Sequence, residues 1–168
     1  MHFPNKATIC YLIDSEGRLL LQKKSKGFGK GKWNGPGGKI EKGETPKECV
    51  QREVKEETGI EVLKVESRGE LEFIFPHKPE DNFYCYVFVA RDFQGEPEDK
   101  GEGELKWFKK EELPLSRMWD DDRYWLLEML EGNFVRKRFY FDKNNSVQSH
   151  YDIKQNRSLQ QGGKNEQC

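Results

Sequence analysis

Short runs of apolar or alternating side chains dominate the chain and predict a strand-rich fold. Strands are expected at residues 7–13, 19–22, 61–75, 82–91, 105–108, 134–141 and 147–154. The turn-forming residues 14–17 predict that the first two strands are antiparallel neighbours. Residues 143–145 likewise predict a hairpin of the last two strands.

Two segments have the pattern of helices. The clearer one, at residues 46–58, follows the N-cap Thr45, which forms a Thr-x-x-Glu capping box with Glu48, and it ends before Gly59. A second helix is predicted at residues 120–131. Many strands with two helices of different character indicate an α+β fold.

Length and charge set the broad class. The 168 residues suit one domain, expected over residues 1–154, with a polar and disordered tail at 155–168. The net charge of −1 argues against a protein that coats duplex nucleic acid, but a metal ion can neutralise a nucleotide substrate locally. Without an apolar run long enough for a signal peptide or a membrane span, we expect a monomer in the cytoplasm.

Three carboxylates share one face of the first helix. Glu53, Glu56 and Glu57 are three or four residues apart or adjacent, and they lie toward the helix C-terminus, where the helix dipole disfavours anions. Alone, such a pattern is typical of a solvated acidic surface. A cation that relieves the repulsion is the alternative, and clustered oxygen ligands suit Mg²⁺ or Mn²⁺.

The surrounding residues favour the cation. From Gly38 to Ile60 the sequence follows Gly-x5-Glu-x7-Arg-Glu-apolar-x-Glu-Glu-x-Gly-apolar at every specified position, and the chain therefore resembles a Nudix hydrolase. The resemblance implies an α/β/α sandwich with a mixed sheet, a catalytic loop–helix–loop and a C-terminal helix. It also implies roles for individual residues: metal ligands at Glu53, Glu56, Glu57 and the carbonyl of Gly38, structural roles for Glu44, Arg52 and Gly59, and a phosphate contact at Lys39.

Hydrolysis of a pyrophosphate also needs a group that accepts a proton from water. Glu56 and Glu57 are candidates, and so is Glu102, which aligns with an acidic residue that lies near the metal ions in the family. Glu104 is close enough along the chain to remain open. A solvated loop glutamate is the structural alternative for Glu102.

Two further segments resemble the oxidised-purine nucleoside triphosphatases of this family. They are the glycine-rich stretch 27–39, which contains Trp-Asn-Gly, and the Met-Trp-Asp-Asp-Asp-Arg-Tyr-Trp segment at 118–125. The resemblance implies base contacts from Asn34, Trp119, Asp121 and Asp122, apolar walls from Phe28, Phe73 and Met118, and a sugar or phosphate contact from Lys24. Asp120 departs from the pattern, which has proline there, so the base-reading pair among the three aspartates stays open.

Adjacent carboxyl groups in a dry pocket do not both ionise easily, so one can donate a hydrogen bond while the other accepts. The alternatives are structural: helix capping for the aspartates, a turn role for Asn34 and a core position for Trp33. The expected function is metal-dependent conversion of oxidised purine (deoxy)nucleoside triphosphates such as 8-oxo-dGTP to the monophosphate and pyrophosphate. Ordinary or deaminated nucleotides, ADP-ribose or dinucleoside polyphosphates are the alternative substrates, and a non-catalytic nucleotide-binding module is the remaining alternative.

Overall fold

The computed structural model describes residues 3–154. The tail expected at 155–168 lies outside these residues. A six-stranded mixed sheet in the order β4-β1-β6-β5-β8-β9 forms the centre of the molecule. Its strands are β4 (Gly37–Lys39), β1 (Asn5–Leu12), β6 (Phe83–Gln94), β5 (Glu61–Ile74), β8 (Val135–Phe141) and β9 (Val147–Asp152).

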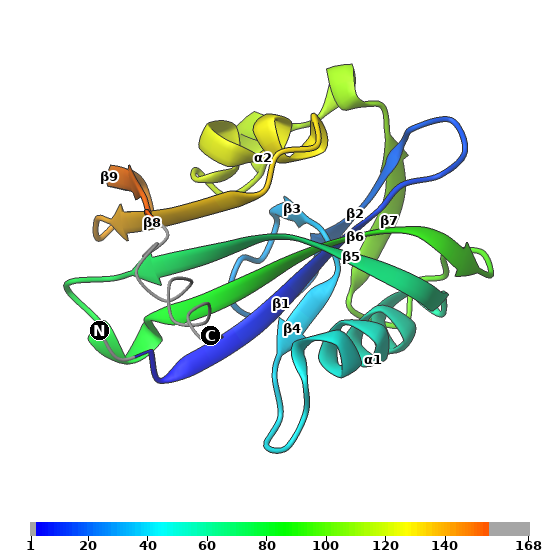
Figure 1. The fold of residues 1–168 in the computed structure, drawn as a ribbon, viewed down its shortest axis with the longest axis horizontal. Coiled ribbons are helices and arrows are strands. Elements are labelled where there is room, and N and C mark those ends of the chain that lie inside the picture. Colours follow the sequence, from blue (N-terminus) through cyan, green and yellow to red (C-terminus); the bar gives the residue numbers. More distant parts are fainter. Residues whose placement is uncertain (1–2, 155–168) are drawn as a thin grey trace, which may run out of the picture.

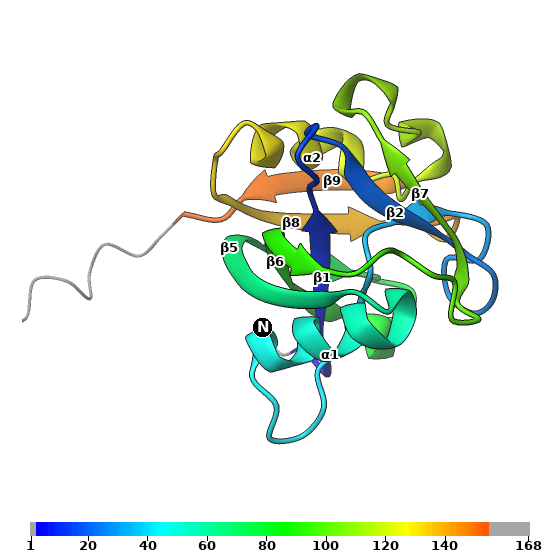
Figure 2. The ribbon, with the colours of Figure 1, turned by 90° about the vertical axis from the view of Figure 1, so that its right-hand side faces the viewer.

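Two helices cover opposite faces of this sheet, α1 (Pro46–Thr58) and α2 (Asp122–Leu130) (Figure 1). The view turned by 90° shows the same three layers, with α1 and α2 on either side of the strands (Figure 2). The arrangement confirms the predicted α+β class and the α/β/α layering. Three short 3₁₀ helices connect the strands, at Pro79–Asp81, Lys110–Glu112 and Leu115–Arg117.

A second, three-stranded sheet has the order β3-β2-β7, formed by β3 (Trp33–Asn34), β2 (Leu19–Lys24) and β7 (Gly103–Phe108). The predicted turn between the first two strands is present, but their antiparallel pairing is limited to the isolated bridge Ile13–Leu19, and β1 and β2 belong to different sheets. β1 instead pairs in parallel with β6 and antiparallel with β4. The pairing of β1 is therefore determined by strands that are distant in the sequence and not by the turn that follows it.

The sheet separates two hydrophobic cores. The larger core, on the side of α2, contains Trp125 and Met129 of the helix and Phe139 of β8. The smaller core, under α1, contains Val50 and Val54. Both cores are well buried, so the sheet is held from both faces.

The sequence predicted α1 at its observed bounds. The Thr45 hydroxyl accepts a hydrogen bond from the backbone N–H of Glu48 at 3.1 Å, and Gly59 ends the helix with a left-handed φ of 77°. The second helix begins later than predicted, at Asp122. Asp121 occupies its N-cap position but forms no side-chain cap hydrogen bond, so capping does not explain this aspartate.

Candidate active site

Arg52 organises the acidic face of α1. Its guanidinium forms two hydrogen bonds with the Glu44 carboxylate, from Nε at 2.6 Å and from Nη2 at 2.9 Å, and Nη2 also donates to the carbonyl of Lys39 at 3.2 Å. Hydrogen bonding to Arg52 lowers the pKa of Glu44 to about 2. These contacts tie the loop before α1 to the helix.

The same guanidinium lies against two of the three predicted metal ligands. Its Nη1 is 2.9 Å from Glu53 Oε1 and 3.2 Å from Glu56 Oε2. Glu56 is largely exposed, whereas Glu53 is mostly covered, with 16% of its side chain accessible. Arg52 therefore supplies positive charge between these two carboxylates in this structure.

Glu53 and Glu57 carry negative charge into a partly dry site. Burial raises the pKa of Glu57 to about 8, with a further increase from the charge of Glu53. Burial also raises the pKa of Glu53, although Arg52 opposes the change. Gly38 makes this packing possible, because a Cβ atom there would lie 2.5 Å from the Glu53 carboxyl carbon. The Glu53 carboxylate thus lies directly against the backbone of β4.

This donor set fits a hard divalent cation. Clustered carboxylate oxygens beside a backbone segment are the ligands that Mg²⁺ and Mn²⁺ prefer. The pKa values of Glu53 and Glu57 are raised first by burial and then by the charges of neighbouring carboxylates, so the ionised forms of both are disfavoured without a cation. Within residues 3–154, no three His, Cys, Asp or Glu side chains are already arranged as a closed metal site.

Glu102 lies near the same cluster, because its charge contributes to the raised pKa of Glu57. Hydrogen bonds hold the loop that carries Glu102. The backbone carbonyl of Glu102 accepts hydrogen bonds from the backbone N–H and the hydroxyl of Ser25, both at 3.0 Å. Gly103 follows with a φ of 146° and packs so tightly on β2 that no Cβ fits. Glu104, by contrast, is exposed on β7.

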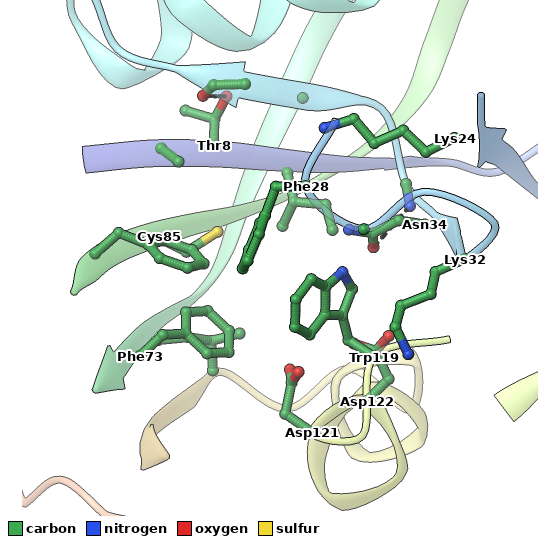
Figure 3. Close-up of a pocket in the computed structure, with 18 of the residues that line it drawn as sticks. Thr8, Lys24, Phe28, Lys32, Asn34, Phe73, Cys85, Trp119, Asp121 and Asp122 are labelled. Carbon is green, nitrogen blue, oxygen red and sulfur yellow. Dashed lines mark hydrogen bonds between the residues drawn. The ribbon is translucent and has the colours of Figure 1, made fainter. Parts of the chain in front are cut away.

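A cavity of about 220 Å³ connects the acidic cluster to the opposite side of the sheet. It reaches Glu57 and Gly38 at one end and α2 at the other. The structure brings most of the predicted site residues to this cavity: Lys24, Phe28, Asn34, Gly38, Glu57, Phe73, Trp119, Asp121 and Asp122 (Figure 3). Asn34 and Lys24 lie on one side of it, and the two aspartates lie on the other (Figure 3).

The aspartate pair forms a buried acidic wall. Asp121 and Asp122 are each 2% exposed. Asp121 Oδ2 accepts a hydrogen bond from Trp125 Nε1 at 2.8 Å, whereas Asp122 Oδ2 has no partner among the described residues. Burial raises the pKa of both carboxyls, and the charge of Asp121 raises the pKa of Asp122 further, whereas a hydrogen bond with Asp122 opposes the rise for Asp121. Lys32 also lines the cavity, and its positive charge opposes the rise in the pKa of Asp122.

Aromatic rings form the adjoining wall. The Phe28 ring lies 4.8 Å from Trp119, centroid to centroid, and Lys32 Nζ lies 5.4 Å from the Trp119 ring centre. Phe28 is 54% exposed. Gly29 next to it has a φ of 85°, and a Cβ there would meet Trp119 Nε1 at 3.2 Å. The part of the glycine-rich stretch before β3 is therefore a loop that brings its backbone close to an aromatic ring.

The comparisons with known proteins agree with this geometry. A model of the NUDIX domain matches residues 3–129. The chain belongs to the Nudix family. It is 35% identical to the "Oxidized purine nucleoside triphosphate hydrolase" of Danio rerio over 148 residues, covering 88% of this chain and 94% of that protein. It is 34% identical to the Mus musculus protein of the same name, covering 83% of this chain and 88% of that one.

A solved structure supports the same assignment. The MutT protein of Bacillus halodurans superimposes with a TM-score of 0.78 at 29% identity, covering 88% of this chain and 96% of that one. The chain is thus a Nudix hydrolase, and members of this family bind nucleotide substrates and generally require a divalent metal ion such as Mg²⁺. Within residues 3–154, no helix has the length and apolar character to cross a membrane.

Several expected Nudix site residues lie outside the cavity. Met118 is 2% exposed and belongs to the larger core, so it does not form part of the cavity wall. Lys39 is exposed on β4 and does not reach the cavity either. Trp33 is a core residue, in agreement with the structural alternative. Asp120 accepts a hydrogen bond from the N–H of Val147 at 2.7 Å. Unlike Asp121 and Asp122, it does not line the cavity.

Sequence reasoning missed three polar residues that line the cavity, Thr8, Gln22 and Lys32. Gln22 interrupts the apolar run of β2 and is 6% exposed. The signal in the sequence was a polar residue directly after three leucines. This signal is weak, because polar residues are common at strand ends. Lys32 lies in the glycine-rich stretch, where a lysine near the surface gives no distinct signal.

Proposed function

We propose that this Nudix hydrolase converts oxidised purine (deoxy)nucleoside triphosphates, such as 8-oxo-dGTP, to the monophosphate and pyrophosphate. The observation that carries the proposal is the buried pair Asp121 and Asp122 beside Trp119, in a cavity that also reaches Glu57. The two relatives with the name oxidised purine nucleoside triphosphate hydrolase, each covered over more than 80% of its length, support the same substrate class.

The pair suits a base whose hydrogen-bonding edge varies. Because burial of both carboxyls and the charge of Asp121 beside Asp122 favour one shared proton, one carboxyl can donate to a carbonyl oxygen while the other accepts from an N–H group. Trp119 offers a flat surface on which the purine can stack. Asn34 lies across the cavity from the two aspartates. Exchange of the proton between the aspartates would accommodate an oxidised guanine or an oxidised adenine.

The acidic cluster on α1 would hold the metal ion that hydrolysis of the triphosphate needs. Glu53, Glu56, Glu57 and the carbonyl of Gly38 are the proposed ligands of Mg²⁺, with Mn²⁺ as a substitute. The ion, when bound, supplies neutralisation of phosphate charge and polarisation of a P–O bond. Arg52 and Glu44 hold the loop of β4 against α1, so that the ligands keep their positions.

A proton acceptor completes the site. Glu102 is our candidate, because the Ser25 contacts fix its loop and its charge acts on Glu57. Glu56 and Glu57 are the alternatives within the cluster. Lys24, which lines the cavity mouth, is positioned to attract the sugar–phosphate part of the nucleotide. The chain's own groups thus bind the base at one end and receive the proton from water at the other.

A pyrophosphate-release screen tests the proposal. Purified protein is assayed with 8-oxo-dGTP, 2-hydroxy-dATP, dGTP, dATP, dITP, ADP-ribose and a dinucleoside polyphosphate, with Mg²⁺ and with EDTA. We expect the highest kcat/KM for the oxidised purines and no release in EDTA. A preference for any other member of the panel would reassign the substrate within the Nudix family. No metal-stimulated release from any compound would favour a binding module.

A further inference from the structure

Gln22 occupies an unusual place in the second sheet. It lies in the middle strand β2, directly opposite Asn34 of β3. Directly paired residues of neighbouring strands have side chains on the same face, so the two amides are neighbours. Lys24, two residues further along β2, shares this face, and all three residues line the cavity. The face of the second sheet therefore presents two amides and a lysine toward the bound nucleotide.

The Gln22 amide lacks a partner. Gln22 is only 6% exposed, and its Nε2 has no hydrogen-bond partner among residues 3–154. A buried amide without a partner is unfavourable, and native proteins contain few of them outside ligand sites. Leu20, two residues earlier on the same face, is fully buried in the core under α1. An apolar residue would thus fit at position 22 if only packing mattered.

We propose that Gln22 is a specificity-determining residue whose side-chain amide hydrogen-bonds the purine base beside Asn34. This inference rests on the proposed function. Two amides on the β2–β3 face then oppose the two carboxyls of Asp121 and Asp122 across the cavity, so the base is held from both of its edges. An amide both donates and accepts, so a half-turn about its last bond fits it to either kind of base edge.

The test replaces Gln22 with an apolar residue of similar length. For Gln22→Met we expect kcat/KM for the preferred oxidised purine to fall about tenfold, mainly through KM, and its preference over the unoxidised base to fall with it. The melting temperature stays equal or rises, because an unpartnered buried amide has been removed. Gln94→Met, on the exposed end of β6, is the matched control and leaves both quantities unchanged.

Other outcomes overturn the inference. An unchanged kcat/KM means that ordered water satisfies the amide. An equal loss for oxidised and ordinary nucleotides places the contact on sugar or phosphate and not on the base. A lower melting temperature with unchanged selectivity shows a purely structural role. The proposed function fails separately, if the wild-type protein itself prefers no oxidised purine.

A measurement on the wild-type protein guards against a variant that misfolds. The side-chain amide resonances of Gln22 and Asn34 are followed by ¹⁵N NMR while 8-oxo-dGMP or dGMP is added. We expect the Gln22 resonance to shift and its hydrogen exchange to slow with 8-oxo-dGMP. A shift of Asn34 alone overturns the role of Gln22 and leaves the proposed function standing.

Discussion

Replacement of Glu57 by glutamine should have opposite effects on stability and activity. The folded protein raises the pKa of this carboxyl from 4.5 to about 8, so the folded chain binds the proton more tightly than the unfolded chain. Stability is therefore lost as the pH rises from about 4.5 to about 8. At pH 7 the shift corresponds to at most about 3 kcal/mol, and since the excess charge is shared with Glu53 we expect about 2 kcal/mol.

The neutral amide of Glu57→Gln avoids this cost while it still can accept the hydrogen bond from Gly37. In EDTA at pH 7, we expect the melting temperature to rise by about 4–8 °C, with a gain that shrinks toward pH 5. Added Mg²⁺ should raise the melting temperature of the wild type more than that of the variant. Pyrophosphate release should fall by about 100-fold or more.

The measurement is thermal unfolding across pH 5–8, with and without Mg²⁺. Glu61→Gln removes an exposed glutamate outside the cluster and serves as the control, with an unchanged melting temperature. A variant that is less stable than the wild type in EDTA at pH 7 would refute the electrostatic reasoning. So would a gain that does not depend on pH.

Further predictions concern the other charged groups. Glu53→Gln and Glu56→Gln should each lower turnover about 10³-fold with an unchanged circular dichroism spectrum. Asp121→Asn and Asp122→Asn should each change the ratio of kcat/KM between 8-oxo-dGTP and 2-hydroxy-dATP, measured by steady-state kinetics. Lys32→Met removes a cation that lowers the pKa of Asp122, so the acidic limb of the pH profile of kcat/KM should move to higher pH.

Each of these predictions has an outcome that contradicts it. Wild-type turnover in either glutamate variant would reject the metal ligands. Unchanged selectivity in both aspartate variants would reject the shared proton. A pH profile of Lys32→Met that stays in place, or moves to lower pH, would show that this lysine does not act on the pair.

Local signals predicted α1 and most strands because the determinants lie within a few residues. Thr45 and Gly59 fix both ends of α1 wherever the helix packs. The pairing of β1 with β2 is limited to one bridge because β1 pairs with β6, whose residues are 78 positions further along the chain, and no local pattern reveals that partner. Asp121 and Asp122 had the pattern of caps, yet tertiary burial beside Trp125 determines their environment.

The acidic motif predicted that Glu53, Glu56 and Glu57 lie together, because their spacing on a helix follows from its geometry. The cavity wall was harder to predict. Met118 and Trp119 are adjacent, but only Trp119 reaches the cavity, since the direction of a side chain in an irregular segment depends on tertiary packing. Gln22 becomes informative only when its burial is known.

The two cores on either side of the sheet have a consequence for how such enzymes diversify. Along β1, Ile9 and Tyr11 pack toward α2, whereas Cys10 and Leu12 pack toward α1. In the proposed function, Asp121 and Asp122 contact the base on the α2 side of the sheet, whereas Glu53 and Glu56 hold the metal ion on the α1 side. Substitutions confined to the α2 half can retune which nucleotide is accepted while the hydrolytic half keeps its form.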